Sequence, residues 1–304
     1  MELGLLDFCQ LEPRKAIAYQ LASAIELAKA AEQLGYSRYW LSEHHEPDIA
    51  HSCPEVLAGI IAAETHRINV GTAGVLIRHH DPYRLGKTFQ LLTNLFGSRI
   101  DCGLSSSLSM SAVTRGCTHV AEDQLDQSLE KFLSVIREPS RLSSGACVPV
   151  AWMMGRITSL RRAAQHGTPF ALDGLFHLND LIEMRDSISE YYETFSAATV
   201  GSLPYCVLAI AVSCGETDDA ARAQVAAYLN LRGPQGVQPT IVGEGERCAA
   251  RIVEVVDATG AAGAVVVDIS TGFYQRLAAS TSLIDGFRKL GQSLHAGEMS
   301  CQRN

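Results

Sequence analysis

The stretch Trp40-Leu41-Ser42-Glu43-His44-His45 decides the fold of this chain. A hydrophobic strand ends there in one carboxylate and two imidazoles. An earlier strand is predicted at Leu3–Leu6, and apolar residues three and four apart between Ile17 and Leu34 predict the helix that connects the two strands. Such a β/α unit delivers titratable side chains to the carboxyl end of a parallel sheet, where the functional sites of α/β proteins lie.

Strands and helices alternate along the rest of the chain in the same way. Apolar runs predict strands at 3–6, 39–41, 68–75, 99–104, 148–154, 169–172, 206–213 and 264–269. Amphipathic stretches predict helices at 17–34, 54–64, 82–95, 124–137, 158–166, 179–195, 218–230 and 246–259. Residues 231–240 are expected to be a loop within one unit. Eight β/α units favour a single-domain (β/α)8 TIM barrel over residues 1–304, rather than an open sheet.

Composition and charge narrow the functional classes. The 304 residues have a formal net charge of −8, whereas nucleic-acid binding needs a basic face, so we expect no DNA or RNA partner. No apolar run approaches the roughly 18 residues that span a bilayer, and the first residues show no signal-peptide pattern. We therefore expect no membrane association and a cytoplasmic location. Nine cysteines without a C-x-x-C pair suit that reducing compartment.

Five histidines follow the second and third predicted strands: His44, His45, His51, His79 and His80. In a barrel these loops meet at one mouth. Three interpretations are open. The histidines are ordinary loop residues, or they bind a metal ion together with Glu43 and Asp81 in a metal-dependent hydrolase, or one of them lies beside a cofactor. Neighbouring residues of an extended strand point to opposite faces, which disfavours a metal cage and favours one productive ring. Either ring of the pair His44 and His45 fits this role.

A second candidate site follows the fifth predicted strand. Gly155 and Arg156 precede Thr158 and Ser159 at the start of a predicted helix. Free N–H groups, the helix dipole and these side chains favour a bound phosphate, while the alternative is an ordinary helix cap at Thr158. The run Ser105–Ser107 follows the fourth strand at the same mouth, and its hydroxyls line a polar pocket or solvate a loop.

Four blocks of this sequence resemble the bacterial luciferase-like family of flavin-dependent monooxygenases. They are residues 31–36 with 40–45, residues 68–75 with 81–84, residues 97–104, and residues 149–155 with 163–167. Residues 211–220 resemble the family's seventh strand and helix, and residues 242–246 resemble the start of its final helix. The blocks follow one another in register over nearly the whole chain.

The resemblance implies a cofactor, an activity and partners. It implies an FMN-dependent monooxygenase in which reduced FMN (FMNH2) and O2 as co-substrate oxygenate a small organic substrate through C4a-peroxyflavin chemistry, and we favour a role in specialised metabolism. It also implies a separate NAD(P)H:flavin reductase. Relatives often form a homodimer through helices near the second and third strands, where the Ala-rich faces 22–31 and 58–63 would permit close packing.

The resemblance also assigns site residues. It implies a catalytic role for His44 with Glu43, and a place for the Ala73-Gly74 backbone under the flavin ring, where a small residue lets the chain approach closely. It places Gly155, Arg156, Thr158 and Ser159 at the FMN phosphate. Ser105 and Ser106 are the further cofactor-binding candidates.

One departure from the family keeps other functions open. Where many relatives have a glycine-rich segment with an arginine, this chain has Ser105-Ser106-Ser107, so a cation expected near the phosphate is replaced and Arg156 is the candidate that compensates. The first alternative is therefore a non-catalytic flavin-binding homologue or subunit. A metal-dependent hydrolase is the lower-ranked alternative, and deazaflavin in place of FMN is a further alternative for the cofactor.

Overall fold

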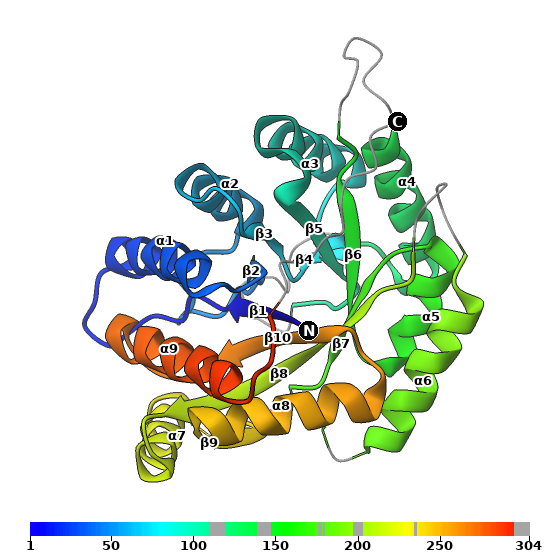
Figure 1. The fold of residues 1–304 in the computed structure, drawn as a ribbon. Helices are drawn as coiled ribbons and strands as arrows, with labels where there is room; N and C mark the ends of the chain where they lie inside the picture. Colours follow the sequence, from blue (N-terminus) through cyan, green and yellow to red (C-terminus); the bar gives the residue numbers. More distant parts are fainter. Residues whose placement is uncertain are drawn as a thin grey trace.

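Eight parallel strands close into a barrel in the computed structural model, which describes residues 1–109, 119–138, 147–175, 178, 180–196, 203–233 and 236–294. The barrel strands are β1 (Glu2–Asp7), β2 (Arg38–Leu41), β3 (Asn69–Thr72), β5 (Ile100–Ser105), β6 (Val150–Gly155), β7 (Phe170–Asp173), β8 (Cys206–Gly215) and β10 (Gly263–Asp268). The first and last strands close the sheet, with Leu3 beside Ala264. The predicted (β/α)8 barrel is therefore confirmed (Figure 1).

Helices surround the barrel on its outside (Figure 1). They are α1 (Ile17–Leu34), α2 (Pro54–Glu64), α3 (Pro82–Phe96), α4 (Leu125–Arg137), α5 (Ile157–His166), α6 (Leu181–Thr194), α7 (Asp218–Arg232), α8 (Gly245–Thr259) and α9 (Phe273–Lys289). Local signals explain several of their ends. The N–H of Arg84 binds the Asp81 side chain at the start of α3, and Gly35 ends α1 in the left-handed conformation. Among the described residues, no helix is long and apolar enough to cross a bilayer.

Three sequence predictions need correction. The strand predicted at 68–75 is two strands, because β3 ends at Thr72 and β4 (Val75–Leu76) pairs separately with β5. A further strand, β9 (Ile241–Glu244), lies between α7 and α8 and pairs with the end of β8. Residues 242–246 therefore do not begin the final helix, which is α9. Residue 179 of the predicted sixth helix and residues 234–235 of the predicted loop lie outside the described residues.

Alternate residues of each strand face two different core layers. On β2, Tyr39 and Leu41 pack in the layer between the strands and the helices, whereas Trp40 faces the barrel interior. The outer layer also takes up the alanines of α1 and α2, including Ala28 and Ala58, which are fully buried. Most alanines of the two faces thus pack within their own chain, whereas Ala22 and Ala63 are exposed, and a dimer contact there stays a prediction.

A buried polar cluster fills the interior of the barrel. Arg38 lies 2.8 Å from Glu2 and 2.7 Å from Asp101, and the indole N–H groups of Trp40 and Trp152 donate to Asp101. The two indole rings lie edge to face, 5.0 Å apart. Each buried charge thus has opposite charges or hydrogen bonds around it, as the cost of desolvation requires. The interior is a packed core and not a channel.

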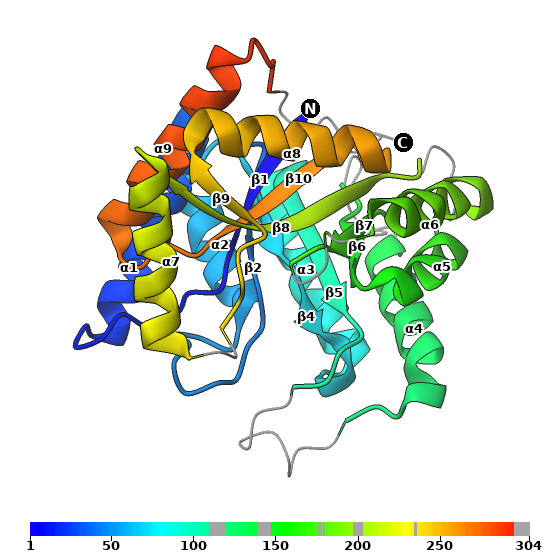
Figure 2. The same cartoon turned by 90° about the horizontal axis from the view of Figure 1, so that it is seen from below.

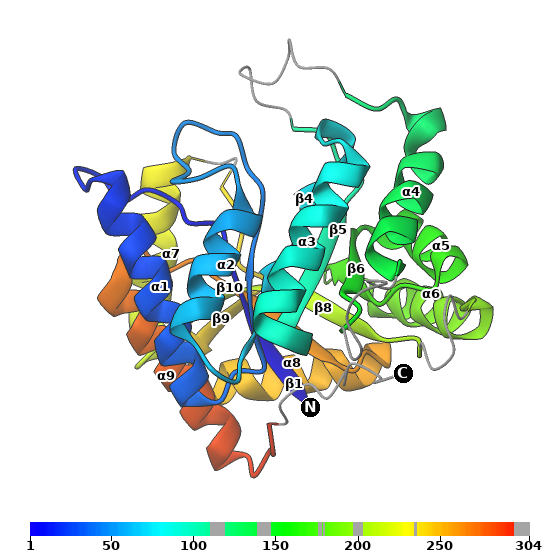
Figure 3. The same cartoon turned by 90° about the horizontal axis from the view of Figure 1, so that it is seen from above.

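The loops that follow the strands emerge together at one edge of the barrel. Figures 2 and 3 show this edge from two sides, at the bottom of the first view and at the top of the second. The loop between β2 and α2, residues 42–53, is prominent there. It contains Glu43, His44 and His45, so the predicted site lies at the carboxyl ends of the strands, where sites in this fold are built.

Candidate functional site

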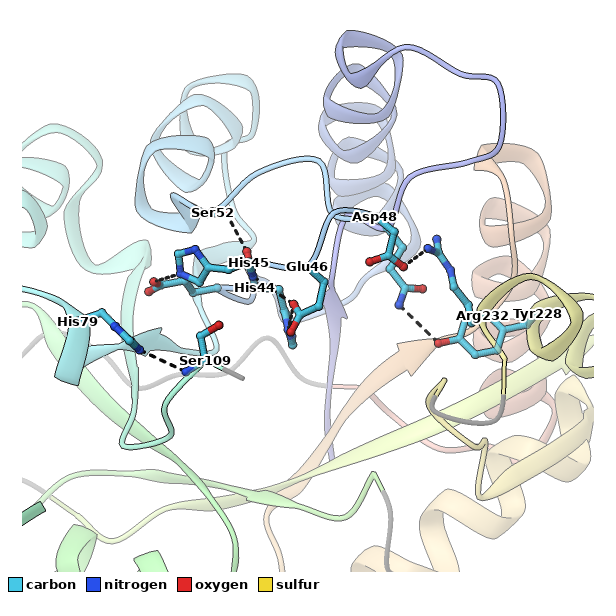
Figure 4. Close-up of polar contacts among 11 residues, drawn as sticks. His44, His45, Glu46, Asp48, Ser52, His79, Ser109, Tyr228 and Arg232 are labelled. Atoms are coloured by element: carbon cyan, nitrogen blue, oxygen red, sulfur yellow. Dashed lines mark hydrogen bonds and ion pairs between the residues drawn. The ribbon is translucent and has the colours of Figure 1, made fainter. Parts of the chain in front are cut away.

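The two neighbouring imidazoles of the β2–α2 loop point in different directions (Figure 4). The His45 Nε2 atom lies 2.8 Å from Glu43 Oε1. The His44 ring packs against Phe8, with 5.0 Å between ring centroids, and its Nδ1 atom is 3.3 Å from Glu46 Oε2. Phe8 follows the interior-facing residue Leu6 by two positions, so His44 is the ring on the interior side of the mouth.

Glu43 is the centre of a buried hydrogen-bond network. The side chain is only 1% exposed, and its Oε2 atom accepts hydrogen bonds from the Leu76 backbone N–H and from His80 Nε2, both at 2.8 Å. Burial raises the pKa of Glu43, but the hydrogen bonds from His80, Leu76 and His45 outweigh it, and the pKa lies below the ordinary carboxyl value. The carboxylate therefore joins the end of β2 to β4 and to the residues that follow it.

His80 is the counterpart of Glu43 in this network. Burial lowers its pKa, but the hydrogen bond to Glu43 and the charge of that carboxylate outweigh burial and raise the pKa above the ordinary value. His79, its neighbour, accepts a hydrogen bond from the Ser109 N–H at Nε2, and burial lowers its pKa. The two adjacent histidines thus have opposite protonation preferences because only one of them contacts a carboxylate.

The five histidines gather at one mouth, as predicted, but their geometry differs from that of a metal site. Both ring nitrogens of His51 are buried without a hydrogen-bond partner among the described residues. In the same part of the chain, no group of three or more His, Cys, Asp or Glu side chains has the arrangement to hold a metal ion. The described residues therefore lend no support to a metal-dependent hydrolase.

The start of α5 presents an open polar surface. Helix α5 begins at Ile157, its N-cap is Arg156, and no side chain caps it. The cap interpretation of Thr158 is therefore wrong, because Thr158 is the second helical residue and its side chain is exposed. The Arg156 side chain is exposed too, and it has no ionic partner in the described part of the chain. Gly155 has a φ of 156°, and a Cβ there would lie 3.1 Å from Ser159 Oγ.

The predicted flavin-binding segments lie on neighbouring strands. Ser105, the last residue of β5, stands beside Met154 of β6, so Ser105 and Ser106 adjoin Gly155 and the start of α5. Ala73 and Gly74, joined by a cis peptide bond, lie between β3 and β4. A Cβ at residue 74 would lie 2.7 Å from the Leu104 carbonyl carbon, so glycine is required there by the approach of β5. His44 follows β2, the next strand around the barrel.

Sequence reasoning missed residues on the other side of the mouth. Asp268 ends β10, and Gln20 lies in α1; both line a pocket beside Phe8. The signal for Asp268 was present, because a carboxylate at the end of a buried valine-rich strand is the same pattern that marked Glu43. Gln20 carried no signal, since nothing in a helical sequence shows that a glutamine points into a pocket.

The closed barrel, with titratable side chains at one mouth, defines a (β/α)8 protein whose candidate site lies at the carboxyl ends of the strands. Residues 1–139 match the family model described as "Luciferase-like monooxygenase", and the chain belongs to this family. The uncharacterized protein YceB of Bacillus subtilis (strain 168) is 30% identical over 237 residues, which cover 73% of this chain and 71% of YceB.

Solved structures show the same architecture. The crystal structure of apo-MsnO8 has a TM-score of 0.80 and 24% identity, and the match covers 94% of this chain and 98% of MsnO8. The oxygenating constituent of 3,6-diketocamphane monooxygenase from Pseudomonas putida, in complex with FMN, has a TM-score of 0.74 and 18% identity, with 93% and 96% of the two chains covered. At these identities the likeness shows the fold.

Proposed function

We propose that this chain is an FMN-dependent monooxygenase, in which reduced FMN and O2 oxygenate a small organic substrate. One observation carries the proposal. The interior-facing His44, the Ala73-Gly74 segment, Ser105 and the open start of α5 follow one another on adjacent strands of a luciferase-like barrel. This arrangement matches an elongated cofactor with a ring system at one end and a phosphate at the other.

The start of α5 fits the phosphate of FMN. The N–H groups of Ile157 and Thr158, in the first turn of the helix, have no intrahelical acceptor, and the helix dipole favours an anion there. Arg156 adds a cation that lacks an ionic partner among the described residues, and Thr158 and Ser159 add hydroxyl donors. Ser105 and Ser106 would contribute hydroxyls from β5, and Arg156 would replace the cation that relatives place on that strand.

His44 is the proposed catalytic residue. Bound reduced FMN supplies the electrons that activate O2, and the protein supplies positioning and a hydrogen bond. Burial lowers the pKa of His44, although the charge of Glu46 opposes this effect, so the imidazole is neutral at pH 7. A neutral ring whose Nδ1 atom faces Glu46 leaves Nε2 to exchange a proton with a group bound at the mouth.

Glu43 is better placed to position other residues than to react. Both of its oxygens are already hydrogen-bonded to His45, His80 and the Leu76 N–H, and its side chain is buried. We propose that it fixes the β2–α2 loop relative to β4, so that His44 is held at the mouth. Its predicted catalytic role thus becomes a positioning role in the proposal.

We propose a homodimer and a separate NAD(P)H:flavin reductase as partners. Apolar side chains are exposed on the outer surface of α2 and α3: Val56 is 59% exposed, Ile60 48%, Leu91 59% and Leu95 64%. The two residues of each helix are four positions apart and lie on one face of it. This apolar surface, and not the buried alanines, supports a second copy of the chain packing on α2 and α3.

The test compares FMN with riboflavin, which lacks the phosphate. Both flavins are titrated into the purified protein in the oxidised and photoreduced states, and flavin fluorescence and absorbance report binding. We expect FMN to bind more tightly than riboflavin, and Arg156→Gln to weaken FMN binding at least tenfold, because a charge-assisted hydrogen bond contributes roughly 1.5–3 kcal/mol. Arg161→Gln is the matched control, since Arg161 is on the same helix but pairs with Glu190 at the surface.

The other outcomes separate the alternatives. Equal affinity for FMN and riboflavin would contradict the phosphate site, and binding of neither would contradict the flavin proposal. FMN binding without oxygen transfer to any compound of a substrate panel would favour a non-catalytic flavin-binding homologue. Tight binding of a deazaflavin with weak binding of FMN would favour a deazaflavin enzyme.

A further inference from the structure

The pocket beside Phe8 opens at the barrel mouth, on the side opposite the start of α5. It lies between the ends of β1 and β10 and the last turn of α7, and polar residues from six segments line it: Asp7, Glu12, Gln20, Arg232, Asp268 and Arg276. Phe8 also lines the pocket, and its ring is 5.0 Å from the ring of His44. The pocket and the proposed catalytic histidine are therefore separated by a single side chain.

Three buried oxygen atoms of the lining residues have no partner among the described residues. They are Asp268 Oδ2, Glu12 Oε1 and Gln20 Oε1. Gln20 is only 3% exposed, and the other oxygen of Asp268 already accepts a hydrogen bond from the Ser270 N–H at 2.9 Å. Buried polar atoms in folded proteins nearly always have a partner, and all three of these atoms are acceptors.

The two arginines of the pocket do not supply those partners, although the Nε atom of Arg232 is itself buried without a partner among the described residues. Arg276 is 3.0 Å from Asp7 and is held by that carboxylate, and Arg232 pairs with Asp48 and donates to the Leu11 carbonyl. Burial raises the pKa of Asp268 to about 6, and the charge of Arg276 and two hydrogen bonds from Ser270 limit the rise. The pocket lining thus has three carboxyl groups, of Asp7, Glu12 and Asp268, and two guanidinium groups, each of which already pairs with another carboxylate, Asp48 or Asp7.

We propose that this pocket binds a protonated primary amine of the substrate. An ammonium group has three N–H donors and no acceptor, which matches a site with three unpartnered oxygens and two carboxylates. Its positive charge also distinguishes it from a hydroxyl group or a water molecule, because burying a carboxylate without a counter-charge is costly. The inference rests on the proposed function, since an amine held beside Phe8 leaves the rest of the substrate next to His44.

The experiment measures binding of butylammonium chloride to the flavin-free protein at pH 7.5. Butan-1-ol and sodium butyrate are the comparison probes, because they keep the alkyl chain and change only the head group. Saturation-transfer NMR detects the weak complexes, and its concentration dependence gives the dissociation constants. We expect butylammonium to bind at least tenfold more tightly than either comparison probe.

Two variants locate the binding. Asp268→Asn keeps the shape and the contact with Ser270 but removes the charge, and Gln20→Leu removes an acceptor; each should weaken butylammonium binding at least tenfold. Asp173→Asn is the matched control. Asp173 ends β7 and accepts a hydrogen bond from the Leu175 N–H at 3.0 Å, just as Asp268 ends β10 and accepts a hydrogen bond from the N–H two residues later. This variant should bind the amine as the wild type does.

Several results would overturn the inference. Equal binding of the three probes would contradict a site for an ammonium group. Unchanged butylammonium binding in both Asp268→Asn and Gln20→Leu would contradict the location, as would a loss of binding in Asp173→Asn equal to that in Asp268→Asn. Thermal unfolding of each variant shows whether it folds, and Gln20→Leu keeps the test available if Asp268→Asn does not. FMN titration of the same variants is independent of the amine, so failure of the pocket and failure of the flavin proposal are distinguishable.

Discussion

Arg232, the last residue of α7, forms an ion pair with Asp48 in the loop that follows β2 (Figure 4). The same guanidinium donates a hydrogen bond to the Leu11 carbonyl at 2.8 Å. Leu11 in turn donates its N–H to the Asp48 carbonyl at 2.7 Å, so the loops after β1 and β2 are joined to each other and to α7. The loop that contains His44 is thus held near its middle by a residue late in the chain.

Replacing Arg232 by Met should loosen this loop. The Arg232 side chain is 9% exposed and Asp48 is 48% exposed, so we expect a loss of about 1–2 kcal/mol in the free energy of unfolding. Hydrogen exchange should increase in residues 46–51. Arg222→Met is the control, because Arg222 lies on the same helix and pairs at the surface with Asp219. Unchanged exchange in the loop would show that the ion pair does not hold it.

Replacing His44 by Ala should separate cofactor binding from turnover. FMN affinity should change little, because the predicted phosphate-binding residues are at the start of α5. Product formation should fall by about 10²–10⁴-fold, the usual contribution of a positioned acid or base. His66→Ala is the control, since His66 is exposed in the turn before β3. Turnover that is unchanged in the His44 variant would remove this residue from the mechanism.

The contact between Glu43 and His80 should make stability depend on pH. The pKa of His80 is raised in the folded protein. Its contribution to stability is therefore complete below about pH 6.5, and it is lost as the pH rises through the pKa of His80 in the folded state. The pKa of Glu43 is lowered, so its contribution is lost as the pH falls below about 4.5. The stability difference between wild type and His80→Gln should therefore be largest at about pH 5–6, roughly 1–3 kcal/mol, and smaller at pH 8.

Urea unfolding of both proteins across this pH range measures the difference. A stability difference that stays constant from pH 5 to pH 8 would contradict the charged contact. His66→Gln, a substitution at an exposed histidine, shows how much of the dependence comes from histidine titration in general.

Asp268 should have the opposite pH dependence to Glu43. Its pKa is raised from 3.8 to about 6, because of burial, so the folded protein binds a proton that the unfolded chain releases. Its contribution to stability should fall by up to about 3 kcal/mol as the pH rises from about 4 to about 6. Asp268→Asn should remove this fall and be more stable than wild type at pH 7. A variant with the wild-type pH profile would contradict the prediction.

The exposed apolar surface of α2 and α3 should be covered in solution. The double variant Val56→Glu and Leu95→Glu places charges on residues that are 59% and 64% exposed, so its effect on the folded monomer should be small. If a homodimer forms there, sedimentation of the variant should give a monomer while the wild type gives a dimer. Tyr274→Glu, on α9 and 75% exposed, is the control and should not change the mass. A monomeric wild type would refute the proposed dimer.

The alternation of strands and helices was predictable because the sequence periods are clear. Helix α2 begins at Pro54 and ends at Glu64 as predicted, since a proline in the first turn and an apolar stripe mark it. Helix α9 was missed. Its N-cap is Gly272, which offers no capping side chain, and it contains Gly286, where a Cβ would lie 2.2 Å from the Gly245 carbonyl oxygen. Gly286 is needed for the close contact between α9 and the start of α8, but in the sequence a glycine at this position resembles the end of a helix.

The candidate site was predictable in its position and not in its contacts. A carboxylate and imidazoles at the end of a strand indicated the barrel mouth, which is where Glu43, His44 and His45 lie. The sequence could not show that Glu43 would be buried, because its partners Leu76 and His80 are 33 and 37 residues away in the chain. The direction of His44 followed from its contact with Phe8, the residue after β1, which only tertiary packing determines.

The placement of Trp40 and Trp152 gives the protein an optical property. The chain has two tryptophans, and both are 1% exposed, edge to face inside the barrel, with their N–H groups on one carboxylate. All tryptophan fluorescence therefore originates at a single buried location, where side chains of β2 and β6 meet inside the barrel. The emission should respond when the barrel itself opens, and it should remain constant while surface helices or loops move.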